Sequence, residues 1–306
     1  MEKKNFGYAF APAHISGIFV IDLKKDPILS GSLGCGICLE DGVVTKISAA
    51  KETTVKINGA VADAPTTLTA IKLLTSQPVL VETTLSIPCG AGFGASGAGA
   101  LSAALALNEA LSLDMTLKEL ACAAHVAEVT NRTGLGDITG QTFGGIVIRK
   151  KAGAPFTINI DKLPCGNTTI SWVSFGEIST KSVLSDELKK KSINKAGKSG
   201  LKELLRKPTL HNFFRQSCLF AKEIGLMSPQ VRDAIEAVSA AGGIASQAML
   251  GNTVFAINDD GALSEFGAVH TSGISNTGAH LLLKPLRKVY QTTGMVRHTR
   301  TRPPEA

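Results

Sequence analysis

An alternating strand that runs directly into a series of glycines constrains this chain more than any other feature. Residues 79–87 alternate apolar and polar side chains, which is typical of a β-strand with one buried face. The segment that follows, PCGAGFGASGAGALSAA (residues 88–104), begins as a glycine loop and passes into an alanine-rich helix. Glycines let the main chain approach a ligand closely, and unpaired N–H groups at a helix start attract anions. The segment therefore predicts a phosphate site, with close packing of small residues as the structural alternative.

Two common nucleotide-binding designs do not fit this loop. Residues 92–97 match the G-x-G-x-x-G spacing of dinucleotide-binding folds, but that design continues into a second strand that ends in an acidic residue. Here two helices follow, and the second begins at Thr116 with the capping-box pattern Thr-Leu-Lys-Glu. A P-loop needs a lysine at the start of its helix, and no lysine lies between Ile87 and Leu117. Both designs are excluded.

Strand and helix patterns are mixed irregularly along the rest of the chain. Strands are predicted at 8–11, 18–23, 36–39, 43–47, 145–149, 157–160, 169–175, 253–258 and near 268, and helices at 64–76, 183–206, 210–224 and 230–241. This order lacks the regular alternation of a doubly wound sheet, so we expect an α+β fold with two domains. We place an N-terminal domain at 1–155, a C-terminal domain at 156–283 and a basic flexible tail at 284–306.

The net charge of +7 is concentrated at the C-terminal end. Residues 284–306 contain six Lys and Arg against one Glu, a net of +5, which leaves +2 for the remainder of the chain. Aromatic residues make up only 5%, so the composition argues against nucleic acid as the main ligand. No apolar run reaches the roughly 18 residues that cross a bilayer, so we expect a cytoplasmic protein without membrane contact. The sequence leaves open whether it forms a homodimer.

Cys35 and Cys38 form a CxxC pair, which in other contexts binds metal or carries out redox chemistry. A zinc site needs two more ligands at matching spacing, and the other four cysteines do not form a second pair. The two residues also lie in a strand-like segment and do not open a helix. We therefore interpret them as buried free thiols.

The glycine segment resembles a motif of the GHMP kinases, the superfamily that includes galactokinase, homoserine kinase and mevalonate kinase. Residues 88–96 are similar to the ATP-binding motif Pro-x-x-x-Gly-Leu-Gly-Ser-Ser-Ala; Ser96 is kept, whereas Ala95 and Gly97 depart from it. The resemblance implies a two-domain fold with the active site in the cleft between domains, ATP and Mg²⁺ as cofactors, and a small-molecule alcohol as acceptor. It assigns nucleotide contacts to Pro88, Gly90, Gly92, Gly94, Ser96 and Gly97.

Two atypical segments narrow this resemblance. Residues 11–17 (APAHISG) resemble the first family motif, Pro-Gly-Lys-Val-x-x-x-Gly, with His14 at the lysine position. Residues 246–255 (SQAMLGNTVF) stand where a third, glycine-rich motif is expected. The combination resembles the archaeal pantoate kinases, a branch that phosphorylates pantoate for coenzyme A synthesis. We therefore expect pantoate as substrate. Homoserine or mevalonate as acceptor, and a non-catalytic sensor of the same fold, remain the alternatives.

The resemblance also implies roles for three polar residues. Phosphoryl transfer needs phosphate positioning, a metal that neutralises charge and an acceptor for the hydroxyl proton. Ser96 and Glu128 match the metal-binding positions and offer the oxygen ligands that Mg²⁺ prefers. Asp137 lies in a glycine-rich loop predicted at 133–140 and matches the catalytic aspartate that accepts the proton. The structural alternatives are a surface glutamate and a turn-forming aspartate.

Pantoate carries a carboxylate, so its pocket is expected to contain cations or converging hydrogen-bond donors. His125 precedes Glu128 by one helical turn and so shares its helix face. Arg149 ends the strand after the catalytic segment and could form a bidentate pair with the acid. Packing of the histidine inside the helix layer and exposure of the arginine are the structural alternatives. The full set of predicted substrate contacts is His125, Arg149, Thr180, His14 and Ser16.

Overall fold

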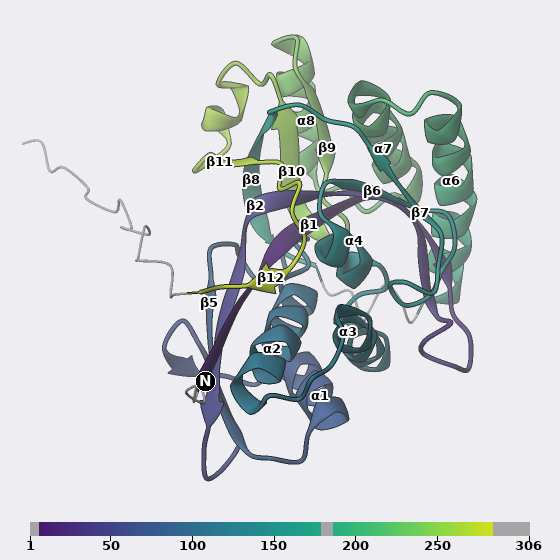
Figure 1. The fold of residues 1–306 in the computed structure, drawn as a ribbon. Coiled ribbons are helices and arrows are strands. Elements are labelled where there is room, and N and C mark those ends of the chain that lie inside the picture. The colour runs from purple at the N-terminus through teal and green to yellow at the C-terminus, as the bar shows by residue number, and fades with distance from the viewer. Residues whose placement is uncertain (1–5, 179–185, 284–306) are drawn as a thin grey trace, which may run out of the picture.

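The computed structural model describes residues 6–178 and 186–283, which form two β-sheets and a set of helices around them (Figure 1). The larger sheet contains β1 (Phe6–Asp22), β2 (Gly31–Ala49), β3 (Thr54–Ile57), β4 (Ala60–Val61), β5 (Val79–Leu85), β6 (Ile146–Arg149), β7 (Ile160–Leu163) and β12 (His280–Leu281). Its order is β12-β1-β2-β5-β3-β4, with β6 on β2 and β7 on β6. Except for the parallel pair of β3 and β5, its strands pair antiparallel.

The smaller sheet has the order β11-β8-β10-β9 and is entirely antiparallel. Its strands are β8 (Thr169–Glu177), β9 (Ile244–Gln247), β10 (Gly251–Ile257) and β11 (His270–Gly273). The helices are α1 (Pro65–Leu74), α2 (Ala95–Leu111), α3 (Leu117–Asn131), α4 (Asp137–Phe143), α6 (Glu187–Arg206), α7 (Leu210–Ile224) and α8 (Pro229–Ala240). Antiparallel sheets with helices grouped on them confirm the predicted α+β class.

β1 and β2 are far longer than the sequence pattern indicates. Four short strands are predicted between residues 8 and 47, whereas the structure forms two strands that pair along their whole length. The pairing shifts register between Pro12 and Ala13 and again between Ser16 and Ile18. Such irregularities bend a strand and re-aim its side chains without ending it. The first family motif therefore lies in the middle of a bent strand.

α2 is the central helix of the N-terminal half. It packs on β1 and β2 on one side and on α1 and α3 on the other, so its small residues are buried all around. A Cβ added at Gly7 would collide with the main-chain oxygen of Ala106, which explains why this crossing needs a glycine. α3 begins with the predicted capping box, in which Thr116 Oγ1 accepts from the Glu119 N–H and the Glu119 carboxylate accepts from the Thr116 N–H at 2.7 Å.

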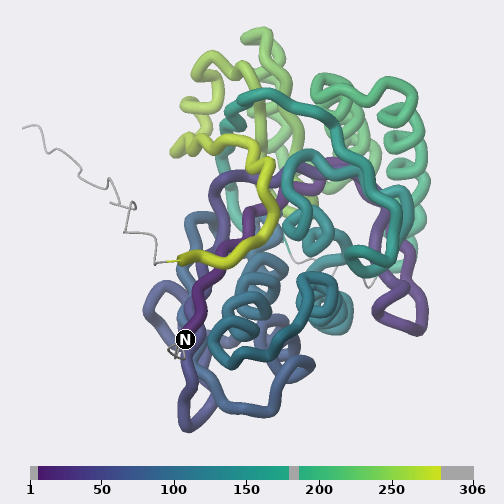
Figure 2. Tube along the Cα trace, in the orientation of Figure 1, coloured from purple at the N-terminus to yellow at the C-terminus, as the bar shows by residue number. Residues whose placement is uncertain are grey.

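Segments from the two ends of the chain lie side by side. Figure 2 shows the yellow C-terminal segment running back along the purple N-terminal strand, where Ala9 of β1 pairs with Leu281 of β12. β7, which follows the predicted domain boundary at residue 155, also belongs to the larger sheet. The predicted tail lies outside the described residues. Across the described residues, no helix is long and apolar enough to cross a membrane.

Candidate active site

A cavity of about 980 Å³ opens beside the glycine loop. Its walls come from the glycine loop and the first turn of α2, the start of α1, the connection between α3 and α4, the middle of β1 and the turn before β10. These segments are far apart in the sequence and include all three of the segments that resemble family motifs. The cavity is large enough to hold a nucleotide together with a small second molecule.

The glycine loop presents the start of α2 to this cavity. Gly94 is the N-cap residue and has a left-handed conformation, with φ of 61°, and no side chain caps the helix. The first N–H groups of α2 are therefore available to a ligand, and they carry the positive end of the helix dipole. Of the predicted nucleotide contacts, Gly90, Gly92, Gly94 and Ser96 line the cavity, whereas Pro88 and Gly97 do not.

Hydrogen bonds and a ring contact hold the glycine loop in place. The His14 N–H donates to the Phe93 carbonyl at 2.9 Å, which ties the loop to β1. Gln141 of α4 donates from Nε2 to the Gly94 carbonyl at 2.8 Å. Phe93 is buried and packs edge-on against Trp172 of β8, with ring centroids 4.7 Å apart. The loop is thus held between both sheets and α4, which favours a preformed phosphate site.

Glu128 is a buried residue of α3, and only 1% of it is exposed. Its Oε1 accepts a hydrogen bond from Ser96 Oγ at 3.2 Å, and its Oε2 has no hydrogen-bond partner. Burial, and secondarily the charge of Asp137, raise the pKa of Glu128 well above its usual range. Because its side chain reaches the first turn of α2, the surface-residue alternative is wrong.

The arrangement around Glu128 fits a divalent cation. A buried carboxylate oxygen without a partner, a second carboxylate nearby and a serine hydroxyl form an all-oxygen donor set of net negative charge. Magnesium prefers such hard oxygen ligands, and a cation would relieve the repulsion between the two acids. Ser96 and Glu128 are therefore suited to the predicted metal role.

Asp137 is the first residue of α4, whereas the sequence pattern predicts a loop through residue 140. An acidic residue is favoured at this position because it faces the positive end of the helix. Asp137 lines the cavity directly beside the glycine loop, since a Cβ added at Gly94 would lie 3.1 Å from the Asp137 Cβ. The predicted catalytic acid and the predicted phosphate loop are thus brought together.

His14 lies behind Asp137 and is fully buried. Its Nδ1 is 2.7 Å from Asp137 Oδ1, and its Nε2 has no hydrogen-bond partner. Burial lowers the pKa of His14, although the aspartate opposes this shift. The neutral ring therefore donates its Nδ1 proton to the carboxylate. The imidazole is enclosed between Gly36 and Gly140, where an added Cβ on either glycine would collide with the ring.

Only some of the other predicted substrate contacts lie at the cavity. Ser16 lines the cavity, and its carbonyl accepts from the Met249 N–H at 3.0 Å, so the first and third motif segments meet there. His125 does not line the cavity; its Nε2 faces the carbonyl oxygens of Ser30 at 2.9 Å and Pro27 at 3.2 Å. Its packing against this turn matches the structural alternative. Thr180 lies outside the described residues.

Arg149 is buried and not exposed as the structural alternative assumes, with 1% of the residue accessible. Its Nε donates to the Ser32 carbonyl at 3.3 Å, while both terminal nitrogens lack hydrogen-bond partners. A Cβ added at Gly136 would lie 2.6 Å from the Arg149 Nε and 2.5 Å from the Ser32 Oγ. Ser32 and Gly136 both line the cavity, so the guanidinium lies just behind its wall.

Several residues that line the cavity or support its walls are not predicted from the sequence. Gln141 supports the loop but carries no motif signal of its own. Arg132, the C-cap residue of α3, is the one Lys or Arg among the described residues that line the cavity. Apolar Val55, Ile57 and Leu85 form part of the wall contributed by the sheet, and only their strand patterns are visible in the sequence.

Cys35 and Cys38 are fully buried free cysteines on β2. Burial raises the pKa of the Cys35 thiol to about 12 and also raises that of Cys38. Both thiols are therefore protonated at neutral pH, which suits packing and not metal binding. Within residues 6–178 and 186–283, no three His, Cys, Asp or Glu side chains form a group that could hold a metal ion.

Comparisons with known proteins agree with this architecture. Residues 49–145 match the model of the GHMP kinases N terminal domain. The chain is 35% identical to the pantoate kinase of Methanocaldococcus jannaschii, over 84% of this chain and 94% of that protein, and 33% identical to the pantoate kinase of Methanospirillum hungatei, over 90% and 96%. A solved structure described as a phosphotransferase related to the CoA biosynthesis pathway superposes with a TM-score of 0.82 and 29% identity, covering 90% of this chain and 98% of its own. The chain therefore belongs to the GHMP kinase superfamily and, within it, to the family of the pantoate kinases.

Proposed function

We propose that this protein transfers the γ-phosphoryl group of ATP to the hydroxyl group of pantoate and so forms 4-phosphopantoate. The observation that carries this proposal is the position of Asp137, whose carboxylate lines the cavity beside the glycine loop and is held by His14. The family relationship supports the choice of pantoate over homoserine or mevalonate. A sensor without turnover would have no use for an oriented proton acceptor at this place.

ATP would bind with its phosphates at the glycine loop. The free N–H groups of the first turn of α2 would donate to phosphate oxygens, and the helix dipole would favour their charge. Arg132 lines the same cavity and could contact a phosphate from its mouth. Val55, Ile57 and Leu85 offer an apolar surface suited to the base. The protein would thus bind the triphosphate largely through its main chain.

Ser96 and Glu128 would hold Mg²⁺. When bound, the ion would neutralise the charge that accumulates on the phosphates during transfer. Glu128 would have to be ionised to take this role, and its raised pKa makes metal binding compete with a proton. The Ser96 hydroxyl now donates to that carboxylate and would turn its oxygen toward the cation.

Asp137 would accept the proton of the pantoate hydroxyl while that oxygen attacks the γ-phosphorus. The new O–P bond forms as the bond to the β,γ-bridging oxygen breaks, and ADP leaves. His14 would keep the carboxylate oriented, because its Nδ1–H occupies Oδ1 and leaves Oδ2 for the substrate. The buried neutral ring replaces the lysine of the usual first motif, so no cationic side chain acts at this position.

The pantoate carboxylate would lie near Ser16 and Ser32, on the β1–β2 side of the cavity. Arg149 lies behind Ser32 and has two buried nitrogens without partners, so its charge is available to an anion at the wall. A buried guanidinium without an acid partner attracts a carboxylate strongly. Thr180 stays a predicted contact, whereas His125 packs against the turn at Ser30 and has no place in this proposal.

Phosphoryl transfer to pantoate tests this proposal directly. The purified protein is incubated with ATP and pantoate, with and without Mg²⁺, and product is measured by mass spectrometry; homoserine and mevalonate serve as acceptor controls. We expect Mg²⁺-dependent 4-phosphopantoate and at least tenfold lower turnover with either control acceptor. Nucleotide binding without transfer to any acceptor would favour the sensor, and preference for another acceptor would overturn the substrate assignment.

A further inference from the structure

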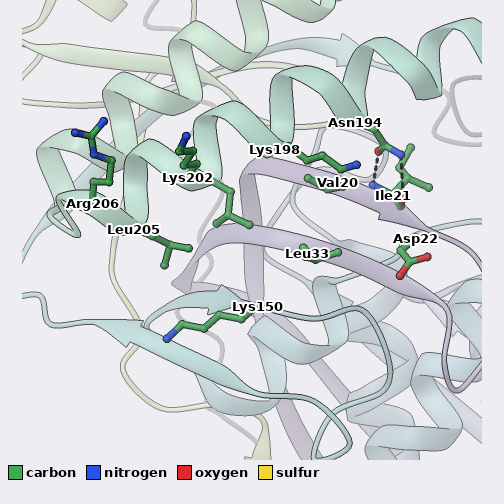
Figure 3. Close-up of a pocket in the computed structure, with 11 residues that line it drawn as sticks. Val20, Ile21, Asp22, Leu33, Lys150, Asn194, Lys198, Lys202, Leu205 and Arg206 are labelled. Atoms are coloured by element: carbon green, nitrogen blue, oxygen red, sulfur yellow. Dashed lines mark hydrogen bonds between the residues drawn. The ribbon is translucent and has the colours of Figure 1, made fainter.

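A second groove, of about 890 Å³, lies between α6 and the ends of β1 and β2 (Figure 3). Its lining residues are Val20, Ile21, Asp22, Leu33, Lys150, Asn194, Lys198, Leu201, Lys202, Leu205 and Arg206. None of these residues lines the catalytic cavity. The size is in the range of small-molecule sites in proteins.

The two grooves use opposite faces of the same strands. Phe19 and Ser32 line the catalytic cavity, whereas their chain neighbours Val20 and Leu33 line the second groove. Successive residues of a strand point to opposite faces, so the side chains of Val20 and Leu33 point away from the catalytic cavity. The second groove is therefore a separate site and not an extension of the first.

The groove is held in shape by close contacts between α6 and β1. Asn194 accepts from the Ile21 N–H at 2.7 Å and donates to the Ile21 carbonyl at 3.0 Å, as the dashed lines in Figure 3 show. A Cβ added at Gly197 would collide with the Phe19 carbonyl, so the helix backbone approaches the strand closely. The walls are thus preformed.

Lys198 and Lys202 give the groove its charge. They lie one turn apart on α6 and both line the groove, and Figure 3 shows the Lys198 side chain beside Val20. Elsewhere in the groove Lys150 pairs with Asp161 at 2.7 Å and Arg206 with Glu203 at 3.2 Å. Among the described residues, neither Lys198 nor Lys202 has an acidic partner within 4.0 Å.

The surroundings favour a negatively charged occupant. α6 contains seven Lys and Arg against two Glu, a net of +5. Asp22 is the one acidic residue among those that line the groove, and it pairs with Lys24 at 2.6 Å. The C-terminal segment 284–306 also carries +5, so like-charge repulsion argues against it as the occupant.

We propose that this groove binds a small organic anion that joins a phosphate group to an apolar portion. The phosphate would lie between Lys198 and Lys202, and the apolar portion would cover Leu33 and Leu205. Leu205 is 42% exposed and Leu33 is partly exposed, so both offer apolar surface to a ligand, with the buried side chains of Val20 and Leu201 beneath them. Neither the cations alone nor the apolar surface alone would select such a molecule; their combination does.

Calorimetric titration with hexyl phosphate tests the proposal on the full chain. The catalytic cavity is first saturated with the ATP analogue AMPPCP, Mg²⁺ and pantoate, so that only other sites remain free. We expect hexyl phosphate to bind about tenfold more tightly than inorganic phosphate at the same ionic strength, because its chain covers the apolar surface. Equal affinities for the two phosphates would overturn the proposal.

Two double variants locate the site. K198Q/K202Q removes the two cations that face the groove, and K189Q/K207Q removes the same charge near the two ends of α6, where neither side chain lines the groove. The first variant should weaken binding of hexyl phosphate about tenfold, and the second by less than about twofold. Equal weakening by both would show general attraction to a basic surface and would exclude the site.

Discussion

The Nδ1 atom of His14 lies 2.7 Å from Oδ1 of Asp137 and joins the middle of β1 to the first turn of α4 across 123 residues of sequence. The ring is fully buried, so it reaches the carboxylate from behind and does not contact the cavity itself. This is the geometry of a positioning residue. It orients the proposed proton acceptor and leaves the cavity side of the carboxylate open.

Replacement of His14 tests this positioning role. His14→Ala removes the donor and should lower kcat about 100-fold, because a small displacement of the acceptor weakens catalysis strongly. In His14→Asn the side-chain amide can donate to Asp137 in place of Nδ1–H. Its kcat should therefore be at least about fivefold higher than that of His14→Ala. KM for ATP should change little in both. Equal kcat values for the two variants would show that the ring only fills space.

Asp137→Asn tests the proton acceptor itself. The amide keeps the shape of the side chain but has little capacity to accept a proton, so kcat should fall by about 10²–10⁴. The glycine loop is untouched, so the affinity for AMPPCP should stay within about threefold, as measured by calorimetry. If nucleotide binding were lost as well, Asp137 would be part of the nucleotide site and the assigned role would be wrong.

Glu128→Gln should raise stability in the absence of Mg²⁺ while it removes activity. The pKa of Glu128 is raised in the folded protein, so the folded state is penalised as pH rises above the unfolded value of 4.5. The variant avoids this penalty and should melt roughly 2–4 °C higher at pH 8, with no difference near pH 4.5. Thermal unfolding at the two pH values measures this.

Glu236→Gln on α8 is the control for this experiment, because Glu236 is exposed and the substitution removes one carboxylate from the surface. Added Mg²⁺ with AMPPCP should stabilise the wild type more than Glu128→Gln. A lower melting temperature for Glu128→Gln at pH 8 would contradict a carboxylate whose charged form is penalised by burial at this position.

The sequence predicts which polar residues belong to the candidate site better than it predicts the contacts that position them. Ser96, Glu128 and Asp137 are predicted because the segments that contain them resemble motifs of a known family. The capping box at Thr116 is predicted because its two partners are one turn apart. Short motifs and contacts one helical turn apart are visible in the sequence itself.

Long-range relationships could not be predicted in this way. No periodicity indicates that His14 meets Asp137, because the bends in β1 that aim the histidine arise from pairing with β2. The same pairing joined strands that the pattern had left separate. Gln141 was missed because its contact with the Gly94 carbonyl depends on how α4 packs. His125 shares a helix face with Glu128, yet its side chain reaches the turn at Ser30.

Arg149→Ala should impair the acid substrate specifically. Loss of a charged donor at the wall should raise KM for pantoate about 10- to 100-fold and leave KM for ATP nearly unchanged. The neighbouring Lys150→Ala is the matched control, because Lys150 is exposed and pairs with Asp161 away from the cavity. Steady-state kinetics of both variants decide the matter, and an unchanged KM for pantoate in Arg149→Ala would exclude the carboxylate contact.

Gly97 and Gly99 offer a matched pair within one helix. A Cβ at Gly97 would lie 2.9 Å from Gln141 Oε1 and 3.0 Å from Glu128 Oε1, whereas the nearest neighbour of a Cβ at Gly99 is Thr67 Oγ1 at 3.4 Å, an ordinary contact. Both Gly→Ala changes gain about 1 kcal/mol of helix propensity. Gly99 lines the cavity, but its added methyl group would displace neither Glu128 nor Gln141, so Gly99→Ala should gain stability and keep most of its affinity for AMPPCP with Mg²⁺.

In Gly97→Ala the added methyl group should displace Glu128 and Gln141. Glu128 is the proposed metal ligand that accepts from Ser96, and Gln141 donates to the Gly94 carbonyl and so supports the glycine loop. We expect the affinity for AMPPCP with Mg²⁺ to fall at least about tenfold, and the affinity without Mg²⁺ to fall less, because the cation position is disturbed more than the main-chain donors. Titrations under both conditions measure this difference. Equal behaviour of the two alanine variants would mean that the space beside Gly97 has no part in the binding of the nucleotide and its cation.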